Sequence, residues 1–290
     1  MSKEASEFQF KIMSLGYRGK GVFKPMNTGW IDEHVACVRE YIANIFFYVK
    51  NGKTLMIDAG YSYPRLGEKM GWLGIDPSSI EHILITHQDT DHVGAVETDS
   101  DGLFNNATLY LSEIENRYLT GEVRRKVTFG MYKLPMVKSD NEKVLLQDGQ
   151  ILDFDGVKVE CILCPGHTWG HMVYLIDDEY LFTGDTIWFG AEGGYSFING
   201  LAEDNKLAKR SLAALEQKLR TRGLRPMVIT GHTGWSRDLD KVFLHRDQVC
   251  NGMKKQKPVD PEAPYDGYRE DDDTEENAKH CRIPEKKWIG

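Results

Sequence analysis

Four side chains that can bind metals lie within six residues of one another in residues 86–94, which read THQDTDHVG. They follow a short apolar run, and they are His87, Asp89, Asp91 and His92. If the run continues as a strand, His87, Asp89 and Asp91 point the same way, because side chains alternate along a strand. If the chain instead turns into a helix near Thr90, His92 comes round to join them. Imidazole and carboxylate groups are ligands of divalent transition metals, so the stretch predicts a metal site.

Three further segments have the same form, in which an apolar run is followed by Gly and then by a residue that can bind a metal. They are Cys164-Pro-Gly-His167, Leu181-Phe-Thr-Gly-Asp185 and Val228-Ile-Thr-Gly-His232. Strand ends on a rigid scaffold can present several ligands to one ion, so we expect His167, Asp185 and His232 at the same site. His171 is expected to donate a hydrogen bond beside the site rather than to bind metal.

Together these segments resemble the pattern of the metallo-β-lactamase superfamily. That pattern has an Asp after an early strand, H-x-H-x-D-H, a His in P-G-H-T, an Asp in T-G-D and a final His, which here are Asp58, residues 87–92, His167, Asp185 and His232. The resemblance covers roughly residues 10–250 and implies an α/β fold, the αββα four-layer sandwich, with two metals at one edge between the sheets. It implies that one ion takes His87, Asp89 and His167, that the other takes Asp91, His92 and His232, and that Asp185 bridges both. Asp58 would steady the ligand loops without binding metal.

Asp89 departs from the family pattern, which usually has His at this position. A carboxylate is charged and an imidazole ligand is neutral, so the site gains a negative charge. With two divalent ions and a bridging hydroxide, three carboxylates bring the site to formal neutrality, where the usual set leaves one positive charge. We therefore expect weaker Lewis acidity and a shift of preference toward harder ions such as iron or manganese, although zinc is the first expectation.

The function that this site predicts is hydrolysis. Two divalent ions lower the pKa of a shared water, and the resulting metal-bound hydroxide attacks an ester, lactone, thioester or amide carbonyl of a small-molecule substrate. Asp91 or Asp185 would accept the proton. Tyr195 is a candidate to hydrogen-bond the substrate oxygen, by similarity to acyl-homoserine lactonases, which supply a Tyr from a comparable position. Trp188 and other aromatic residues near the motifs belong either to a substrate cleft or to the core.

Two other classes of function compete with hydrolysis. A di-iron or mono-iron oxidoreductase acting on oxygen, nitric oxide or a persulfide is favoured by Asp89, because the related flavodiiron oxidoreductases carry a carboxylate there. It would need an electron source, and the chain shows no flavin or Fe–S motif. A binding protein with a vestigial site is disfavoured, because every ligand position is filled.

The elements that position these residues form two similar halves. Strands are expected at 8–15, 37–49, 54–57, 83–86, 157–164, 172–176, 180–183 and 226–230, with a hairpin at Asn51-Gly52. Helices are expected at 63–70, from 77 onward, and at 205–222, where apolar residues recur at helical spacing. Strands followed by helices, twice over, indicate two sheets between helix layers. We expect a metallo-β-lactamase-like domain over 1–256 and an acidic, Pro-containing extension over 257–290 packed on or near it. Residues 257–279 are expected to be irregular or partly mobile, with Trp288 and Ile289 pinning the end.

The composition excludes several partners. The formal net charge is −8, which argues against nucleic acid and anionic membranes. The short basic run Arg124-Arg125-Lys126 is expected to be solvated surface. No signal peptide or membrane span is predicted, and five scattered cysteines suit a reducing, cytoplasmic compartment. Cys161 and Cys164 are expected as buried strand thiols, and the acidic extension could either cover the site or support a homodimer.

Overall fold

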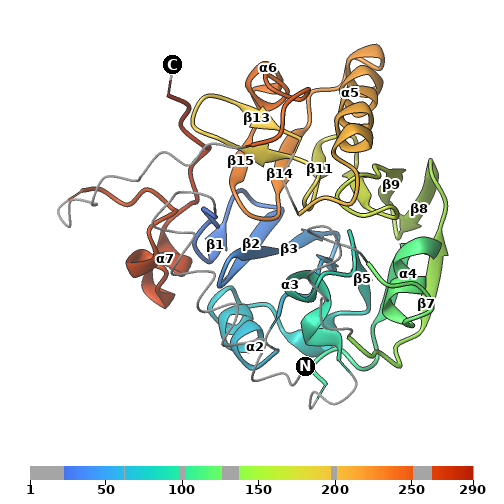
Figure 1. Ribbon diagram of the computed structural model, residues 1–290. Coiled ribbons are helices and arrows are strands. Elements are labelled where there is room, and N and C mark those ends of the chain that lie inside the picture. Colours follow the sequence, from blue (N-terminus) through green and yellow to red (C-terminus); the bar gives the residue numbers. More distant parts are fainter. Residues whose placement is uncertain are drawn as a thin grey trace.

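Two β-sheets lie face to face at the centre of the protein, as the computed structural model in Figure 1 shows. The structure describes residues 23–61, 63–97, 102–125, 137–196, 201–250 and 263–289. The strand expected over 8–15 lies outside these ranges. None of the helices within the described residues is long and apolar enough to cross a bilayer.

The first sheet has seven strands in sequence order. They are β1 (Gly29–Trp30), β2 (Val35–Glu40), β3 (Ala43–Lys50), β4 (Lys53–Ile57), β5 (His82–Leu84), β6 (Thr108–Ser112) and β7 (Lys143–Leu146). The first four strands pair antiparallel, and β4 to β7 pair parallel. The hairpin between β3 and β4 turns at Asn51 and Gly52, whose φ angles of 54° and 73° are those that the Asn-Gly pair predicts.

The second sheet has six strands. In spatial order they are β15 (Gly234–Ser236), β14 (Met227–Thr230), β11 (Tyr180–Phe182), β10 (Met172–Ile176), β9 (Val157–Leu163) and β8 (Gln150–Phe154). Only β11 and β14 pair parallel within it. A separate two-stranded ribbon joins β12 (Trp188–Phe189) to β13 (Gly194–Tyr195).

The alternation of side chains explains the four layers. Along β10, Met172 and Tyr174 point into the core between the sheets, whereas Val173 and Leu175 point to the helix side. Both faces of the strand are buried, so apolar residues occupy every position rather than alternate ones. The result is helix, sheet, sheet, helix, which confirms the αββα sandwich expected from the sequence.

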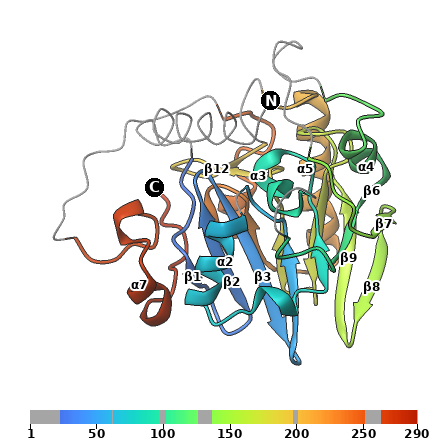
Figure 2. The same cartoon turned by 90° about the horizontal axis from the view of Figure 1, so that it is seen from below.

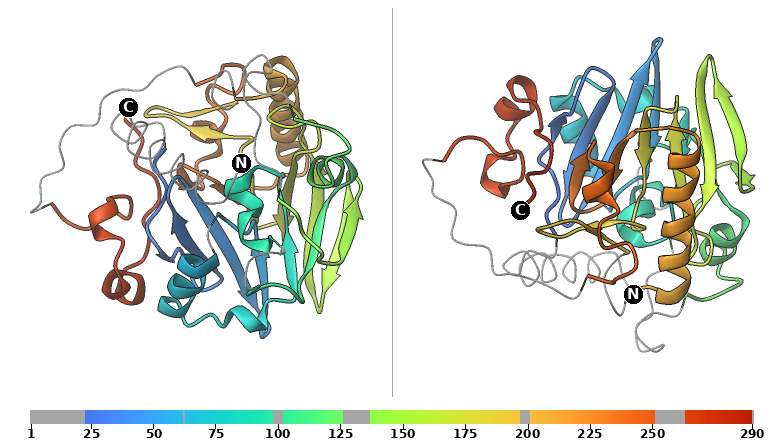
Figure 3. Two further views of the ribbon diagram at one scale, coloured as in Figure 1. Left: turned by 60° about the horizontal axis from the view of Figure 1, so that its bottom comes forward. Right: turned by 90° about the horizontal axis from the view of Figure 1, so that it is seen from above.

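Helices cover the two outer faces. The first sheet carries α2 (Tyr63–Trp72), α3 (Thr90–Val93) and α4 (Glu113–Leu119), and the second carries α5 (Asn205–Thr221) and α6 (Leu239–Val242). Figure 3 shows α5 running along the outside of the second sheet. The helix begins at Asp204, whose carboxylate accepts hydrogen bonds from the amides of Lys206 and Leu207, and it buries Leu212, Leu215 and Leu219 against the sheet.

Some expected boundaries are wrong. Residues 37–49 form two strands, because the chain turns at Tyr41 and Ile42 without a Gly or Pro to mark the turn. The helix start expected at Pro77 is a short 3₁₀ turn, η1 (Pro77–Ser79). A second such turn, η2 (Gly94–Val96), follows α3.

The C-terminal residues 263–289 run back along the body of the protein. They include η4 (Glu270–Asp272) and α7 (Glu275–His280), so the extension is not wholly irregular as expected. Figure 2 shows α7 next to α2 and β1. The end is pinned as expected, because the ring of Trp288 packs on Phe189 and the amide of Ile289 donates to Ala191 O at 2.8 Å. The division at residue 257 stays a prediction.

Candidate metal centre

The predicted ligands come from strand ends at one edge of the sandwich. In the second sheet, β9, β11 and β14 run in the same direction, because β10 pairs antiparallel with β9 and β11 and β14 is parallel to β11. Their carboxyl ends therefore meet at one edge, and His167, Asp185 and His232 follow these three strands. In the first sheet, β4 and β5 are parallel and lead to Asp58 and to the motif that begins at His87.

The motif after β5 turns into a helix rather than continuing as a strand. The strand ends at Leu84 and α3 begins at Thr90. The amide of His92 bonds to Asp89 O at 2.8 Å, and Ala59 N bonds to His92 O at 2.6 Å. Of the two arrangements that the sequence allows, the structure has the helical one, in which His92 joins the other ligands.

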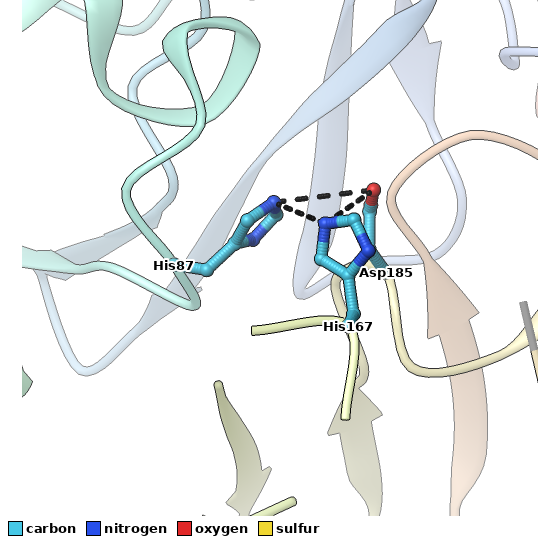
Figure 4. A group of neighbouring side chains, drawn as sticks. All are labelled: His87, His167 and Asp185. Atoms are coloured by element: carbon cyan, nitrogen blue, oxygen red, sulfur yellow. Dashed lines mark hydrogen bonds and ion pairs between the residues drawn. The ribbon is translucent and has the colours of Figure 1, made fainter. Parts of the chain in front are cut away.

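The first ligand group consists of His87, His167 and Asp185 (Figure 4). The Nε2 atoms of the two histidines are 3.1 Å apart. Oδ2 of Asp185 lies 3.9 Å from Nε2 of His87 and 3.5 Å from Nε2 of His167. All three side chains are buried, so the group forms a closed set of ligand atoms around one point.

The second group consists of Asp91, His92 and His232. The Nε2 atoms of His92 and His232 are 3.3 Å apart, and Oδ2 of Asp91 lies 3.8 and 3.6 Å from them. Oδ1 of Asp185 is 3.3 Å from Nε2 of His92 and 3.0 Å from Nε2 of His232. Asp185 thus turns one oxygen to each group, which is the arrangement of a bridging carboxylate.

The hydrogen bonds of the imidazoles test whether these residues fit a metal. Nδ1 of His92 faces a carboxylate oxygen of Asp58 at 2.7 Å, and Nδ1 of His232 faces the carbonyl of Ile42. Both acceptors require a proton on Nδ1, so in its neutral form, the form that binds a metal, each ring turns an unprotonated Nε2 toward the other and toward Asp185. No other hydrogen bond within the described residues reaches the buried Oδ1 of Asp185. Such a cluster of facing lone pairs needs a cation, and the residues therefore fit a metal ion.

The electrostatics point the same way. Burial lowers the pKa of His92, but the carboxylates of Asp185, Asp58 and Asp91 outweigh it and hold the pKa well above its ordinary value. The pKa of His232 is also raised, because Asp185 again outweighs burial. Both shifts favour a positive charge between these side chains, which a bound metal ion supplies.

Asp89 lies beside the first group. Its Oδ2 is 3.6 Å from Nε2 of His87 and 3.3 Å from Nε2 of His167, and its side chain is 13% exposed. The same oxygen accepts a hydrogen bond from the guanidinium of Arg125. Burial raises the pKa of Asp89, but Arg125 and the two histidines hold it well below its usual range.

Arg125 is a site residue that sequence reasoning missed. The expected solvated run divides at this point, because Arg124 is exposed and Arg125 is buried, while Lys126 lies outside the described residues. Burial, and then the charge of Arg125, lower the pKa of His167 to about 3, so that this ring is neutral. The sequence does contain an indication of such a residue. A buried Asp at a position where the family has His requires a nearby positive charge, which a basic residue such as Arg125 can supply.

Glu115 on α4 joins two ligand loops. Its carboxylate accepts from the amide of Gln88 at 2.8 Å and from the hydroxyl of Thr168. Burial raises its pKa to about 7. Tyr118 on the same helix donates to Glu203, which also accepts from the amide of Trp169 at 2.8 Å. Helix α4 thus ties the His87 loop to the His167 loop, and nothing in the sequence pattern identified it.

His171 supports the site through both nitrogens of its ring. Its Nε2 accepts a hydrogen bond from the amide of Asp185 at 3.1 Å. In the neutral ring Nδ1 therefore carries the proton and donates to the hydroxyl of Thr186 at 3.2 Å, in line with the hydrogen-bonding role expected from the sequence. The ring stacks on His87 with 4.9 Å between centroids. Burial and the neighbouring histidines hold its pKa well below the ordinary value, which keeps Nε2 free to accept. His171 belongs to neither ligand group.

The aromatic residues near the motifs divide between core and surface. Trp188 is buried and its ring lies 5.3 Å from that of His232. Tyr195 pairs with Trp188 across the β12–β13 ribbon, and its ring stacks on His245 at 4.7 Å. Trp169 is 45% exposed next to a ligand loop. The catalytic role of Tyr195 stays a prediction. Cys161 and Cys164 are buried free thiols, as expected.

The chain belongs to the metallo-β-lactamase superfamily, a superfamily of metallo-hydrolases, because that family's model matches residues 38–270. The lactamase-like protein nscB of Neosartorya fischeri is 35% identical over 136 residues, which are 46% of this chain and 34% of the relative. The hydroxyacylglutathione hydrolase of Pseudomonas putida is 25% identical over 223 residues, 76% of this chain and 68% of the relative.

A third relative is the probable polyketide biosynthesis zinc-dependent hydrolase BaeB of Bacillus velezensis, 29% identical over 133 residues. The match covers 46% of this chain and 49% of BaeB. The chain therefore spans about a third to a half of the length of nscB and BaeB.

Solved structures support the fold. A B3 metallo-β-lactamase with an active-site glutamic acid superimposes with a TM-score of 0.53 at 17% identity, over 75% of this chain and 82% of that chain. The subclass B3 metallo-β-lactamase MEM-A1 has a TM-score of 0.51 at 17% identity, over 72% and 80%. At this identity the likeness shows the sandwich fold alone.

Proposed function

We propose that the chain is a dinuclear metal-dependent hydrolase that cleaves an ester, lactone, thioester or amide. The observation that carries the proposal is the shared carboxylate of Asp185, which turns one oxygen to each of the two ligand groups. Zinc is the ion we propose, because imidazole nitrogens dominate both groups and BaeB is named a zinc-dependent hydrolase.

Asp91 and Asp185 have different roles in the proposed hydrolysis. When bound, two divalent ions supply an acidified water and polarise a carbonyl. Asp91 is the residue we assign to hold the proton, because its side chain is 14% exposed and solvent can therefore reach it. Asp185 is 5% exposed and its two oxygens face imidazoles on both sides, so its role is to hold the groups together. Oδ2 of Asp91 belongs to the ligand group, so its other oxygen, Oδ1, is the atom that would receive the proton.

The carbonyl substrate class rests on the relatives' names. Hydroxyacylglutathione hydrolase and an atrochrysone carboxyl ACP thioesterase are among the matches, and both names denote the hydrolysis of an acyl group. We propose Tyr195 as the residue that hydrogen-bonds the substrate oxygen. Its support is its pairing with Trp188, which itself packs on His232. A Tyr195→Phe variant should lose turnover and keep its metal content.

Metal content is the first test. Protein purified without added metal should hold about two zinc ions per chain by elemental mass spectrometry. Substitution of His167 or His232 by Ala should each remove one ion, because each belongs to a different group. His280→Ala is the matched control, since the side chain of His280 is 66% exposed. Two zinc ions without hydrolysis of thioesters, lactones, esters or amides would contradict the proposal.

A specific observation favours a second candidate, an iron-dependent oxidoreductase. Asp89 places a third carboxylate beside the first group, and carboxylates favour harder ions. Iron in the purified protein, with an electron paramagnetic resonance signal that responds to reductant and oxygen, would replace the hydrolase proposal with this one.

A further inference from the structure

The guanidinium of Arg125 lies between the loops that carry the first ligand group. Its Nη1 donates to Oδ2 of Asp89, and its Nη2 donates to the carbonyls of Leu201 and His167 at 2.8 and 3.1 Å. The same Nη2 lies 3.2 Å from Nε2 of His167. The Arg125 side chain is 3% exposed. The Asp89–Arg125 ion pair is therefore buried within the site, so solvent screens it less than it would screen a surface ion pair.

Oδ2 of Asp89 can serve two neighbours at once. It lies 3.6 and 3.3 Å from the Nε2 atoms of His87 and His167, close to the roughly 3.3 Å that separates two ligands of one tetrahedral zinc ion. A carboxylate oxygen has two lone pairs, so one can accept from Arg125 while the other faces the histidines. Oδ1 accepts from the side-chain amide of Gln88 at 2.8 Å, which fixes the carboxylate plane.

Among the described residues, the carboxylate that accepts a hydrogen bond from Arg125 is that of Asp89. Glu115 and Glu203 act on it from a greater distance, but their oxygens accept hydrogen bonds from other groups. Glu115 is held by Gln88 and Thr168, and Glu203 by Tyr118 and Trp169. The direct contact of the guanidinium is with Asp89, and arginine keeps its charge at any accessible pH.

We propose that Arg125 is the counter-charge that allows Asp89 to stand in place of the histidine usual in the family. The Asp89–Arg125 pair carries the same net charge as one neutral imidazole. This inference rests on the proposed function only in taking the first group as a metal site. Arg125 acts through Asp89 and is therefore a positioning residue.

A consequence concerns the choice of metal. The prediction from the sequence that the site prefers harder ions, such as iron or manganese, included the negative charge of Asp89 and not the positive charge of Arg125. With Arg125 included, two divalent ions, a hydroxide and three carboxylates leave one positive charge, as the family's usual ligand set does. The pair therefore restores the preference for zinc over manganese or iron that a third unpaired carboxylate would weaken.

The experiment measures metal selectivity rather than activity. Wild-type protein and the variants Arg125→Gln, Arg125→Lys, Asp89→His and the double variant Asp89→His/Arg125→Gln are stripped of metal and titrated with zinc against manganese. Arg125→Gln leaves Asp89 unpaired and should lower the zinc-over-manganese selectivity at least tenfold. Arg125→Lys keeps the charge and should stay within about threefold of wild type. Arg124→Gln is the matched control, because Arg124 is the exposed neighbour.

The double variant shows whether a loss of zinc affinity in Asp89→His comes from the unpaired charge of Arg125 or from the change of side-chain shape. Asp89→His alone leaves the Arg125 charge buried next to His167, and it should bind zinc in the first group at least tenfold more weakly than wild type. Adding Arg125→Gln restores the net charge and should recover that affinity. If Arg125→Gln keeps the wild-type selectivity, or the double variant binds no better than Asp89→His, the inference is wrong. Should Arg125→Gln not fold, the comparison of the double variant with Asp89→His decides.

The same titration separates this inference from the proposed function. Wild-type protein that binds fewer than two zinc ions contradicts the dinuclear hydrolase. Wild-type protein that binds two zinc ions, with selectivity unchanged in Arg125→Gln, contradicts only the role of Arg125.

Discussion

A carboxylate oxygen of Asp58 lies 2.7 Å from Nδ1 of His92, at the point where the first sheet delivers its ligands. The same carboxylate accepts hydrogen bonds from the amide of Thr86 at 2.8 Å and from its hydroxyl. Asp58 therefore fixes the ring of His92 and the start of the His87 loop together. The Thr86 hydroxyl also faces Nδ1 of His87 at 3.0 Å, so one carboxylate orients two ligands.

Replacing Asp58 with Asn should weaken metal binding without removing a ligand. The amide oxygen can still accept from His92, but its NH₂ then faces the amide of Thr86, where two donors meet. We expect zinc affinity to fall 10- to 100-fold, measured by competition with a chelator. Asp155→Asn is the matched control, because Asp155 is exposed and also has a positive φ, 54° against 60° for Asp58. Equal affinities in the two variants would refute the orienting role.

The buried carboxyl group of Glu115 should make the stability of the protein depend on pH. Burial raises its pKa to about 7, whereas the carboxyl of an unfolded chain has a pKa of about 4.3. Between these values the folded protein holds the proton and the unfolded chain does not, so stability falls as pH rises from about 4 to about 7. The whole loss amounts to roughly 4 kcal/mol, since one pKa unit corresponds to about 1.4 kcal/mol.

A Glu115→Gln variant should lack this loss. Its amide oxygen can accept from Gln88 N and its NH₂ can donate to the Thr168 hydroxyl, so both contacts of the acid are preserved. Relative to wild type, the variant should gain about 3 kcal/mol of unfolding free energy between pH 4.5 and pH 8. Urea unfolding of metal-stripped protein measures it, with the exposed Glu113→Gln as control. Parallel pH profiles for wild type and Glu115→Gln would exclude the role assigned to this acid.

The sequence predicts the ligands well because their signal is local. Each of His167, Asp185 and His232 follows an apolar run and a Gly, and strands with both faces buried read as continuous apolar runs. Because buried strands read as continuous runs, the sequence predicts one strand over residues 37–49 and does not indicate the turn at Tyr41 between β2 and β3. The neighbouring Arg39 and Glu40 are buried, and Glu40 pairs with Arg65 on α2, so charge did not mark a surface turn there.

Residues that act through long-range contacts could not be found in this way. Arg125 lies 36 positions from Asp89 in the chain, within a basic run typical of solvated surface. Glu115 sits in a short helix whose pattern carries no metal motif. Their roles depend on which loops the sheets bring together, and that is a property of the folded chain. The helix α7 was missed because acidic composition outweighed the local capping signal of Thr274.

Asp273 anchors the C-terminal segment to the first sheet. Its carboxylate forms an ion pair with Lys69 on α2 at 2.5 Å and accepts from the amide of Thr28 at 2.6 Å. The two charged side chains are only 12% and 7% exposed. Asp273→Ala removes the charged partner of the buried Lys69 ammonium, which keeps its hydrogen bond to the carbonyl of Arg39 at 2.7 Å, and it should cost roughly 3 kcal/mol of unfolding free energy. The exposed Asp271→Ala should cost less than about 0.5 kcal/mol. Equal denaturation midpoints for the two variants would contradict the anchoring role.

Zinc should stabilise the folded protein through both ligand groups. The six ligand side chains come from four loops, so the complete site exists only in the folded chain, and binding to it adds to stability. For each site, free zinc at 100 times the dissociation constant adds about 2.7 kcal/mol. His232→Ala removes a ligand of the second group only, so it should lose about half of the zinc-dependent gain. Asp185→Ala should lose most of it, because that carboxylate faces both groups. Unfolding in urea at rising free zinc measures the gains. Equal losses from His232→Ala and Asp185→Ala would mean that Asp185 serves one ion and that the two groups are independent sites.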